Sequence, residues 1–536
     1  MSADQPRQFL HLTGSQEDCL RVARSKLIQY TATLWISTAS QVPEALPAKK
    51  AHSVLGQEFD AIVFDAFSGL EVNALAAVSG TLRGGGLFIL ISPTIEIWPN
   101  FPDPAYQRFL PYPYTVASVR GLFLKRLLRV LQEPAKTVEL APSLSSSQAK
   151  IVEQIIYSST VLVLTADRGR GKSAALGLAA NRLIAQGNKV LLTAPSRAAV
   201  ESVFKHAELA PVFYAPDDLL LNRPKADVLL VDEAAAIPLN LLLSLVKAYP
   251  RVVFATTLHG YEGSGRGFVL RFQQALNELV PKWQGLRLEQ PMRWPQNDPL
   301  ETLMYRLLLL DVEAAEVQFN PKISVEYKLL PQEQLLVDEA LLQQVFGLLV
   351  AAHYQTRPSD LQQILDAPNL SIHILEQNQQ ILAVALLSRE GGFDAELSAA
   401  IYAGQRRPHG HLVPQTLTFH AKIVGAAELS CERIMRIAVH PSLQGQGLGR
   451  RLVQALKTYA SRQKVDYLAV SYALSPELLR FWQDAGFVLA RIGYRKDTAS
   501  ASRSAVQIHA LSTAGEALVE RILMHSPVDP TRISSD

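Results

Sequence analysis

Two glycine-rich loops constrain the fold of this chain most, because each stands between an apolar run and a helix-like stretch. The first loop covers residues 166–173 (Ala-Asp-Arg-Gly-Arg-Gly-Lys-Ser) and follows the apolar run 161–165. The second covers residues 444–450 (Gln-Gly-Gln-Gly-Leu-Gly-Arg) and follows the run 433–440. A strand, a glycine loop and a helix in this order direct backbone N–H groups at an anion. The sequence therefore predicts α/β structure with two phosphate-binding loops.

The first loop is typical of a nucleoside triphosphate site. Gly171, Lys172 and Ser173 occupy the last positions of the pattern G-x-x-x-x-G-K-[ST], whereas Ala166 replaces its first glycine. In this pattern the lysine binds the β- and γ-phosphates and the hydroxyl ligates magnesium. We therefore expect ATP or GTP with Mg²⁺ at this loop. The expected nucleotide contacts within it are Gly169, Arg170, Gly171, Lys172 and Ser173.

An acidic pair further along the chain supports this interpretation. The apolar run 228–231 ends in Asp232 and Glu233. We expect Asp232 to hold Mg²⁺ together with Ser173, and Glu233 to orient or activate the attacking water. A second motor domain is not recognisable in the sequence. The prediction is therefore an ATPase module and not a processive helicase.

Two further residues are candidates for nucleotide contacts. Gln148 lies upstream of the first loop, at the position of an adenine-contacting glutamine in helicase-like ATPases. Arg293 could stabilise charge on the γ-phosphate. A plain surface position is the alternative for both residues.

The second loop resembles the signature of the Gcn-related N-acetyltransferases, the GNAT fold. Gln444-x-x-Gly447-x-Gly449 follows a strand-like run, and the segment 481–487 resembles the later helix-to-strand motif of that family. The resemblance implies that loop N–H groups bind the acetyl-CoA pyrophosphate, and that the preceding strand holds the pantetheine arm. The implied cofactor contacts are Ile437, Ala438, Val439, Gln444, Gly445, Gln446, Gly447, Leu448, Gly449, Arg450 and Glu477.

The length of 536 residues suits roughly three domains. We expect an α/β fold throughout: a Rossmann-like α/β domain over residues 1–135, and a helicase-like P-loop ATPase domain with a parallel sheet over 136–322. A GNAT acetyltransferase domain over 323–500 and a short tail over 501–536 complete the prediction.

Composition excludes several other classes of protein. A hydrophobic content of 48% and a formal net charge of +3 indicate a globular chain without an overall polyelectrolyte character. The only cysteines, Cys19 and Cys431, are too few for a metal or disulfide framework. The polar N-terminus resembles no signal peptide, and the apolar runs are too short to cross a bilayer. We therefore expect a cytoplasmic protein without membrane contact. The sequence does not report the oligomeric state, and a monomer is our working expectation.

Taken in order, these blocks resemble the bacterial tRNA(Met) cytidine acetyltransferase family, which is related to the eukaryotic RNA cytidine acetyltransferases. Segments beyond the generic motifs carry this resemblance, at 298–301, 352–361 and 406–415. It implies N(4)-acetylation of the wobble cytidine of elongator tRNA(Met), with acetyl-CoA as donor and hydrolysis of ATP or GTP. The alternative is a protein or small-amine acetyltransferase with a regulatory ATPase.

The chemistry of a cytosine amine suggests catalytic residues. Because this amine is conjugated with its ring, it is a poor nucleophile, and positioning against a polarised thioester should contribute most. A base must still accept its proton. His353 is the first candidate and His411 the second, with a structural hydrogen-bonded histidine as the alternative for each. Tyr472 is the candidate acid for the leaving thiolate.

The tRNA contacts must come largely from outside the tail, since little more than one helix is expected there. One candidate is a basic helix over 116–132, which carries Arg120, Lys125, Arg126 and Arg129. Such cations would bind an RNA backbone, and a solvated helix face is the alternative. The loop at Arg406 and Arg407 is the other candidate. We expect nucleotide hydrolysis to help splay the wobble base out of its stack.

Overall fold

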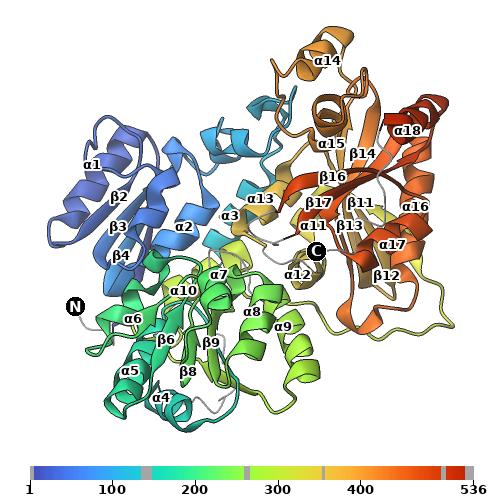
Figure 1. Ribbon diagram of the computed structural model, residues 1–536. Coiled ribbons are helices and arrows are strands. Elements are labelled where there is room, and N and C mark those ends of the chain that lie inside the picture. Colours follow the sequence, from blue (N-terminus) through green and yellow to red (C-terminus); the bar gives the residue numbers. More distant parts are fainter. Residues whose placement is uncertain (1–4, 134–147, 259–265, 353–355, 497–501, 526–536) are drawn as a thin grey trace. The chain divides into compact units, whose positions relative to one another are not determined.

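The computed structural model describes residues 5–133, 148–258, 266–352, 356–496 and 502–525 (Figure 1). The chain forms two compact units. The first draws on residues 1–105, 124–311 and 353–361, and the second on 106–123, 312–352 and 362–536. The first unit contains two parallel sheets and the second a single mixed sheet. This α/β architecture confirms the predicted fold class.

The N-terminal sheet of the first unit has four parallel strands in the order β1-β4-β3-β2. The strands are β1 (Gln8–Thr13), β2 (Thr33–Ile36), β3 (Phe59–Asp65) and β4 (Leu82–Ser92). Helix α1 (Gln16–Leu27) buries Cys19, Leu20 and Ala23 against the sheet. Helix α2 (Val72–Ser79) connects β3 to β4. Apolar runs on β3 and β4 are buried on both faces, as parallel strands require.

The second sheet of this unit has six parallel strands in the order β10-β5-β9-β8-β6-β7. They are β5 (Leu162–Ala166), β6 (Val190–Thr193), β7 (Val212–Phe213), β8 (Val228–Val231), β9 (Val252–Thr257) and β10 (Gln284–Leu288). Helices α4 (Gln148–Tyr157) and α5 (Lys172–Ala185) cover one face, and α8 (Leu239–Ala248) and α9 (Arg266–Leu279) the other (Figure 1). Because β5, β9 and β8 are neighbours, their carboxyl ends meet at one edge.

The sheet of the second unit has seven strands in the order β11-β12-β13-β14-β15-β17-β16. They are β11 (Glu326–Leu330), β12 (Leu370–Gln377), β13 (Gln380–Gly391), β14 (Ser430–Val439), β15 (Tyr467–Ala473), β16 (Val488–Lys496) and β17 (Arg503–Ala510). Only β14 and β15 pair in parallel. Helix α16 (Leu448–Arg462) packs on one face, and α15 (Leu412–Gln415) and α18 (Thr513–His525) on the other.

The C-terminal segment differs from the expectation of a separate tail. Strand β17 lies inside the sheet, between β15 and β16, and its residues Ala505 to Ile508 are buried. The sequence analysis did not predict β17, because the surrounding sequence is rich in Ser and Ala and the strand is stabilised by pairing with β15 and β16. Helix α18 then packs against β17 through Leu518 and Ile522.

The basic helix predicted over 116–132 is wrong in its start, and one of its four cations is not on the surface. Helix α3 (Leu122–Gln132) begins later, and within it the side chain of Arg126 is fully buried. Arg126 donates to the carbonyls of Leu307 (2.7 Å) and Arg306 (2.9 Å). These carbonyls close helix α10 (Pro299–Leu308), where a cation also complements the helix dipole. Arg126 is therefore part of the core, and neither a solvated nor an RNA-binding side chain.

Across the described parts of the chain, no helix combines the length and the apolar character needed to cross a membrane.

Candidate functional sites

The first glycine loop connects β5 to α5 as predicted. Gly171 is the N-cap of α5 and has a φ of 81°, in the left-handed region. The backbone N–H of Met292 donates to the carbonyl of Gly169 (3.0 Å), and Nε2 of Gln148 donates to the carbonyl of Gly171 (3.0 Å). The loop is thereby fixed from two sides, with the N-terminus of a 14-residue helix at its end.

The predicted lysine and acidic pair meet at the carboxyl edge of this sheet. Nζ of Lys172 lies 3.1 Å from Oδ1 of Asp232 and 2.6 Å from Oε1 of Glu233. Burial by itself would lower the pKa of Lys172, but the two carboxylates outweigh it and raise that pKa. Burial raises the pKa of Asp232, whereas Lys172 holds the pKa of Glu233 below its ordinary value against the effect of burial. The lysine is therefore charged, and neutralised by the carboxylates that it contacts.

The residues around Asp232 fit a magnesium ion. Its Oδ1 accepts from Lys172 and from the backbone N–H of Glu233 (2.9 Å), whereas its buried Oδ2 has no hydrogen-bond donor among the residues that the structure describes. The Ser173 hydroxyl acts on the same carboxyl and opposes the rise in its pKa. Mg²⁺ prefers such oxygen ligands and normally takes only one or two from protein, with phosphate and water completing its shell.

The structure directs Arg293 away from the lysine and the acidic pair. Its Nη1 donates to the carbonyl of Gly80 (3.3 Å), and its Nε lies 3.2 Å from Oε1 of Glu58. Both partners belong to the N-terminal part of the first unit. In this conformation Arg293 therefore does not occupy the position predicted for a γ-phosphate contact.

The second glycine loop follows a strand that separates from its neighbour. Strand β14 pairs with β15 only from Cys431 to Ile434, although β14 runs on to Val439 and β15 to Ala473. The pairing of β14 with β13 also shifts its register opposite Arg436 and Ile434. A bulge of this kind bends a strand, and it is frequent next to active sites. A notch thus opens between Ile437–Val439 on one side and Tyr472 on the other.

The loop itself presents an open N-terminus of α16. Gly447 is the N-cap with a φ of 82°, and apart from its chain neighbours no atom of the described residues lies within 4 Å of the position that a Cβ would take there. Backbone N–H groups at such an end attract phosphate oxygens. Arg450 in the first turn forms an exposed ion pair with Asp484 (2.8 Å). Glu477 lies in the first turn of α17 (Pro476–Asp484), where Ser475 is the N-cap.

Tyr472 lies on the β15 side of the notch. Its hydroxyl donates to Oε1 of Gln507, and Nε2 of the same side chain donates to the backbone carbonyl of Phe487 (3.3 Å). Burial raises the pKa of Tyr472, so the phenol keeps its proton at neutral pH.

Comparison with known protein families gives three matches along the chain. Residues 1–140 match the N-terminal region of tRNA(Met) cytidine acetyltransferase TmcA. Residues 163–311 match the helicase domain of RNA cytidine acetyltransferase NAT10/TcmA, and residues 344–465 match GNAT acetyltransferase 2.

Individual relatives extend this similarity over nearly the whole chain. The tRNA(Met) cytidine acetyltransferase TmcA of Nitrosococcus halophilus is 43% identical over 98% of this chain and 79% of its own length. The TmcA of Pectobacterium atrosepticum is 35% identical over 96% of this chain and 78% of its own. This chain belongs to the TmcA family. Its ATPase-like and GNAT portions match family members in the order that the sequence predicted.

The TmcA-like segment 406–415 contains His411, which is hydrogen-bonded through both ring nitrogens. Nδ1 accepts from the backbone N–H of Gly391 (2.9 Å), so Nε2 carries the proton and donates to the carbonyl of Tyr112 (2.6 Å). Burial lowers its pKa. Gly391 pairs with Ser430 on β14. The last pair of β14 with β15 is at Ile434, four residues further on, so His411 contacts the sheet about 13 Å from the point of separation. This geometry favours the structural alternative for His411. His353, the other candidate base, lies outside the described residues.

A buried carboxyl that the sequence analysis missed lies close to the notch. Glu432 on β14 is two residues before the separation, and burial raises its pKa to about 7 although Arg389 lies 3.4 Å away. The neighbouring Glu390 is fully buried and pairs with Arg433 (2.5 Å). The signal in the sequence is the charged pair Glu432-Arg433 within a largely apolar strand.

Proposed function

We propose that this chain is an RNA acetyltransferase that forms N(4)-acetylcytidine at the wobble position of elongator tRNA(Met). Acetyl-CoA supplies the acetyl group, and ATP or GTP is hydrolysed. The observation that carries the proposal is the presence of both sites in one TmcA-family chain. One is the Lys172–Asp232–Glu233 cluster at a phosphate loop, and the other is the notch in front of Gly447.

Acetyl-CoA fits the notch by chemistry as well as by family. The N–H groups at residues 445–449 would bind its pyrophosphate. Its pantetheine arm would lie along Ile437–Val439, where β14 has no ladder pairs with β15. The acetyl carbonyl would then lie where the strands separate, within reach of backbone N–H donors that stabilise the tetrahedral intermediate.

Proton transfer completes the acetyl transfer. The cytidine amine attacks the thioester carbonyl, loses a proton to a base, and the CoA thiolate leaves and takes up a proton. Tyr472 is the proposed donor to the thiolate, because its raised pKa keeps it protonated and it lies on the β15 side of the notch. His353 remains the proposed base. Glu432 is a further candidate, because its pKa of about 7 suits a proton acceptor.

Nucleotide hydrolysis is proposed to present the base, since a thioester already supplies the driving force for acetyl transfer. Lys172 would bind the β- and γ-phosphates, and Glu233 would orient the attacking water. Ser173 and Asp232 would hold Mg²⁺, which neutralises charge on the phosphates when bound. The energy is used to splay the stacked wobble base.

An aromatic and basic surface on the second unit is the proposed tRNA contact. Arg407 and Lys422 lie over the ring of Phe419, at 5.2 Å and 4.7 Å from its centroid, and Lys422 also lies 5.0 Å from the centroid of Tyr402. Arg406 beside them is exposed. Cations bind the RNA backbone while aromatic rings stack on unpaired bases.

The proposed function is tested by nucleoside mass spectrometry. Purified chain, elongator tRNA(Met), acetyl-CoA and ATP or GTP should yield N(4)-acetylcytidine at the wobble position and at no other cytidine. Acetylation of a protein or polyamine with an unmodified tRNA would instead support a regulated protein or small-amine acetyltransferase.

A further inference from the structure

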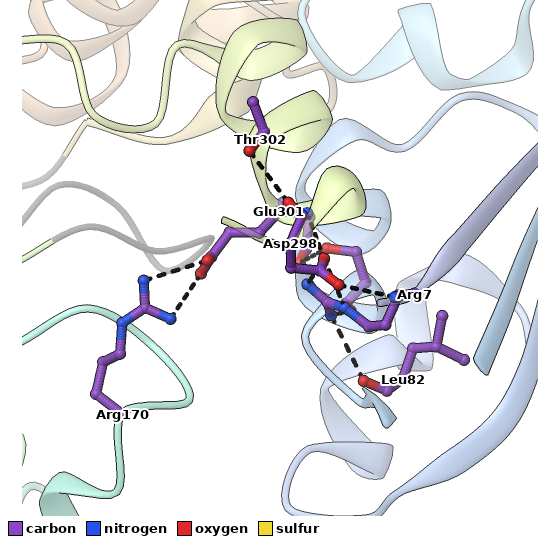
Figure 2. A network of polar contacts seen from close by, with 8 residues as sticks. Arg7, Leu82, Arg170, Asp298, Glu301 and Thr302 are labelled. Carbon is purple, nitrogen blue, oxygen red and sulfur yellow. Dashed lines mark hydrogen bonds and ion pairs between the residues drawn. The ribbon is translucent and has the colours of Figure 1, made fainter. Parts of the chain in front are cut away.

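A buried arginine of the N-terminal sheet reaches the part of the chain that supports the phosphate loop. Arg7 lies just before β1 and is 3% exposed. Its Nε and backbone N–H bind the two carboxylate oxygens of Asp298, at 2.9 Å and 2.8 Å, as Figure 2 shows. Its Nη1 donates to the carbonyl of Ser79 at the end of α2 (2.8 Å). Arg7 thus ties the end of α2 to Asp298, which lies 291 positions after Arg7 in the sequence.

Asp298 passes this contact on to the loop through helix α10. It is the N-cap of α10, where its Oδ1 accepts from the backbone N–H of Glu301 (2.9 Å). The carboxylate of Glu301 pairs with the guanidinium of Arg170 in the phosphate loop, at 3.0 Å and 3.2 Å (Figure 2). Both of these side chains are largely buried. A change in the orientation of α10 would therefore move Arg170.

A second route runs through a tryptophan. The guanidinium carbon of Arg7 lies 3.6 Å from the centroid of the Trp294 ring. The indole in turn packs against Gly169, where a Cβ would lie only 2.7 Å from Cη2 of Trp294. Only glycine allows this approach. Two residues before Trp294, Met292 donates its N–H to the carbonyl of Gly169. Arg7 therefore supports the loop at Gly169 and, through α10, at Arg170.

These contacts carry a conclusion about the nucleotide site. The shape of residues 169–171 decides where the loop N–H groups point, and two of these three residues depend on groups that Arg7 holds. We propose that Arg7 is a positioning residue of the nucleotide site, through which the N-terminal sheet holds the phosphate loop in the conformation that accepts a triphosphate. This inference rests on the proposed nucleotide binding at that loop.

The test uses the full chain with Arg7→Met. Methionine keeps roughly the length of the side chain but removes the guanidinium contacts with Asp298 and the positive charge over the Trp294 ring. The matched control is Arg251→Met. Arg251 donates to the carbonyls of Ile155 and Ile156 near the end of α4. It lies just before β9, at the amino edge of the six-stranded sheet, whereas the phosphate loop lies at the carboxyl edge. Binding of a fluorescent ATP analogue and of CoA, the kcat and KM of hydrolysis, and Tm are measured for each variant.

We expect Arg7→Met to raise the nucleotide Kd roughly tenfold and to leave the Kd for CoA unchanged. Arg251→Met should lower Tm while its nucleotide Kd stays within about twofold of the unmodified chain. An unchanged nucleotide Kd in Arg7→Met overturns the inference. A parallel loss of CoA binding reports general unfolding, and the decision then rests on Glu301→Gln.

A second variant covers the case in which Arg7→Met does not fold. Glu301→Gln leaves the Arg7–Asp298 pair in place and weakens only the contact with Arg170. It should raise the nucleotide Kd by itself, and its effect should not add to that of Arg7→Met. Full additivity contradicts the route through α10.

Lys172→Ala separates the two proposals: if it binds nucleotide normally, the nucleotide site itself is wrong. If it loses nucleotide while Arg7→Met retains it, only the role of Arg7 is wrong.

Discussion

At the scale of single residues, the acidic pair and the buried histidine show how environment assigns a role. Lys172 neutralises Glu233 and Asp232 before any nucleotide is bound, and within the described parts of the chain one oxygen of Asp232 has no donor. His411 by contrast has both nitrogens occupied by backbone groups. Sequence alone offered all of these residues as candidates.

Glu233→Gln should separate nucleotide binding from hydrolysis. The amide keeps the size of the side chain but cannot act as a base or hold the water in the same way. We expect the hydrolysis rate to fall by about 10²–10⁴-fold while the nucleotide Kd changes little. Phosphate release and fluorescent-nucleotide binding measure the two effects. Hydrolysis at the original rate would remove Glu233 from the mechanism.

His411→Gln should lower stability without changing the pH dependence of catalysis. The side chain loses hydrogen bonds to Gly391 and Tyr112 that hold the segment 406–415. We expect a lower Tm, and an unchanged apparent pKa in the pH profile of kcat/KM. If the acidic limb of that profile, where activity falls as the base is protonated, vanished instead, His411 would be the general base after all.

Glu432 should make stability depend on pH. Its pKa is about 7 in the folded chain and 4.5 as its ordinary value, so the folded state binds the proton more tightly. The resulting stabilisation is complete below pH 4.5 and is lost as pH rises through 7, up to about 3 kcal/mol in all. Glu432→Gln should therefore be more stable than the original chain at pH 8, with little difference at pH 4.5. Equal pH dependence of Tm in both proteins would contradict this.

At the scale of elements, the two glycine loops are local patterns and could be predicted, whereas their surroundings could not. The strand–loop–helix order of residues 161–185 and 433–462 is visible over a short stretch of sequence. The burial of Arg126 depends on the end of α10, and the place of β17 depends on β15 and β16. Such contacts join distant residues, and no local periodicity reports them.

Gly447→Ala tests the N-terminus of α16 as the site for the acetyl-CoA pyrophosphate. The φ of 82° costs an L-residue roughly 1–2 kcal/mol, so alanine should tilt the loop N–H groups. We expect the KM for acetyl-CoA to rise about tenfold with nucleotide hydrolysis intact. Gly187→Ala, at a φ of 86° in the first unit, is the matched control for strain alone. Equal KM values in both variants would refute the assignment.

At the scale of the whole molecule, one chain carries the proposed nucleotide site in its first unit and the notch proposed for acetyl-CoA in its second. The predicted three blocks appear as three sheets, but the first two sheets share one compact unit. The Arg7–Asp298 pair within that unit could not be predicted, since neither residue belongs to a motif. The family resemblance identified which domains are present, and only the structure identified what supports them.

The central claim is that nucleotide hydrolysis serves to present the wobble base. The decisive measurement is the acetylation activity of the Lys172→Ala variant on two substrates. These are folded tRNA(Met) and a short unstructured RNA with the anticodon sequence, each assayed with and without nucleotide. We predict no modification of folded tRNA, normal CoA binding, and acetylation of the short RNA at the rate of the unmodified chain. Full modification of folded tRNA by Lys172→Ala without nucleotide would contradict the account.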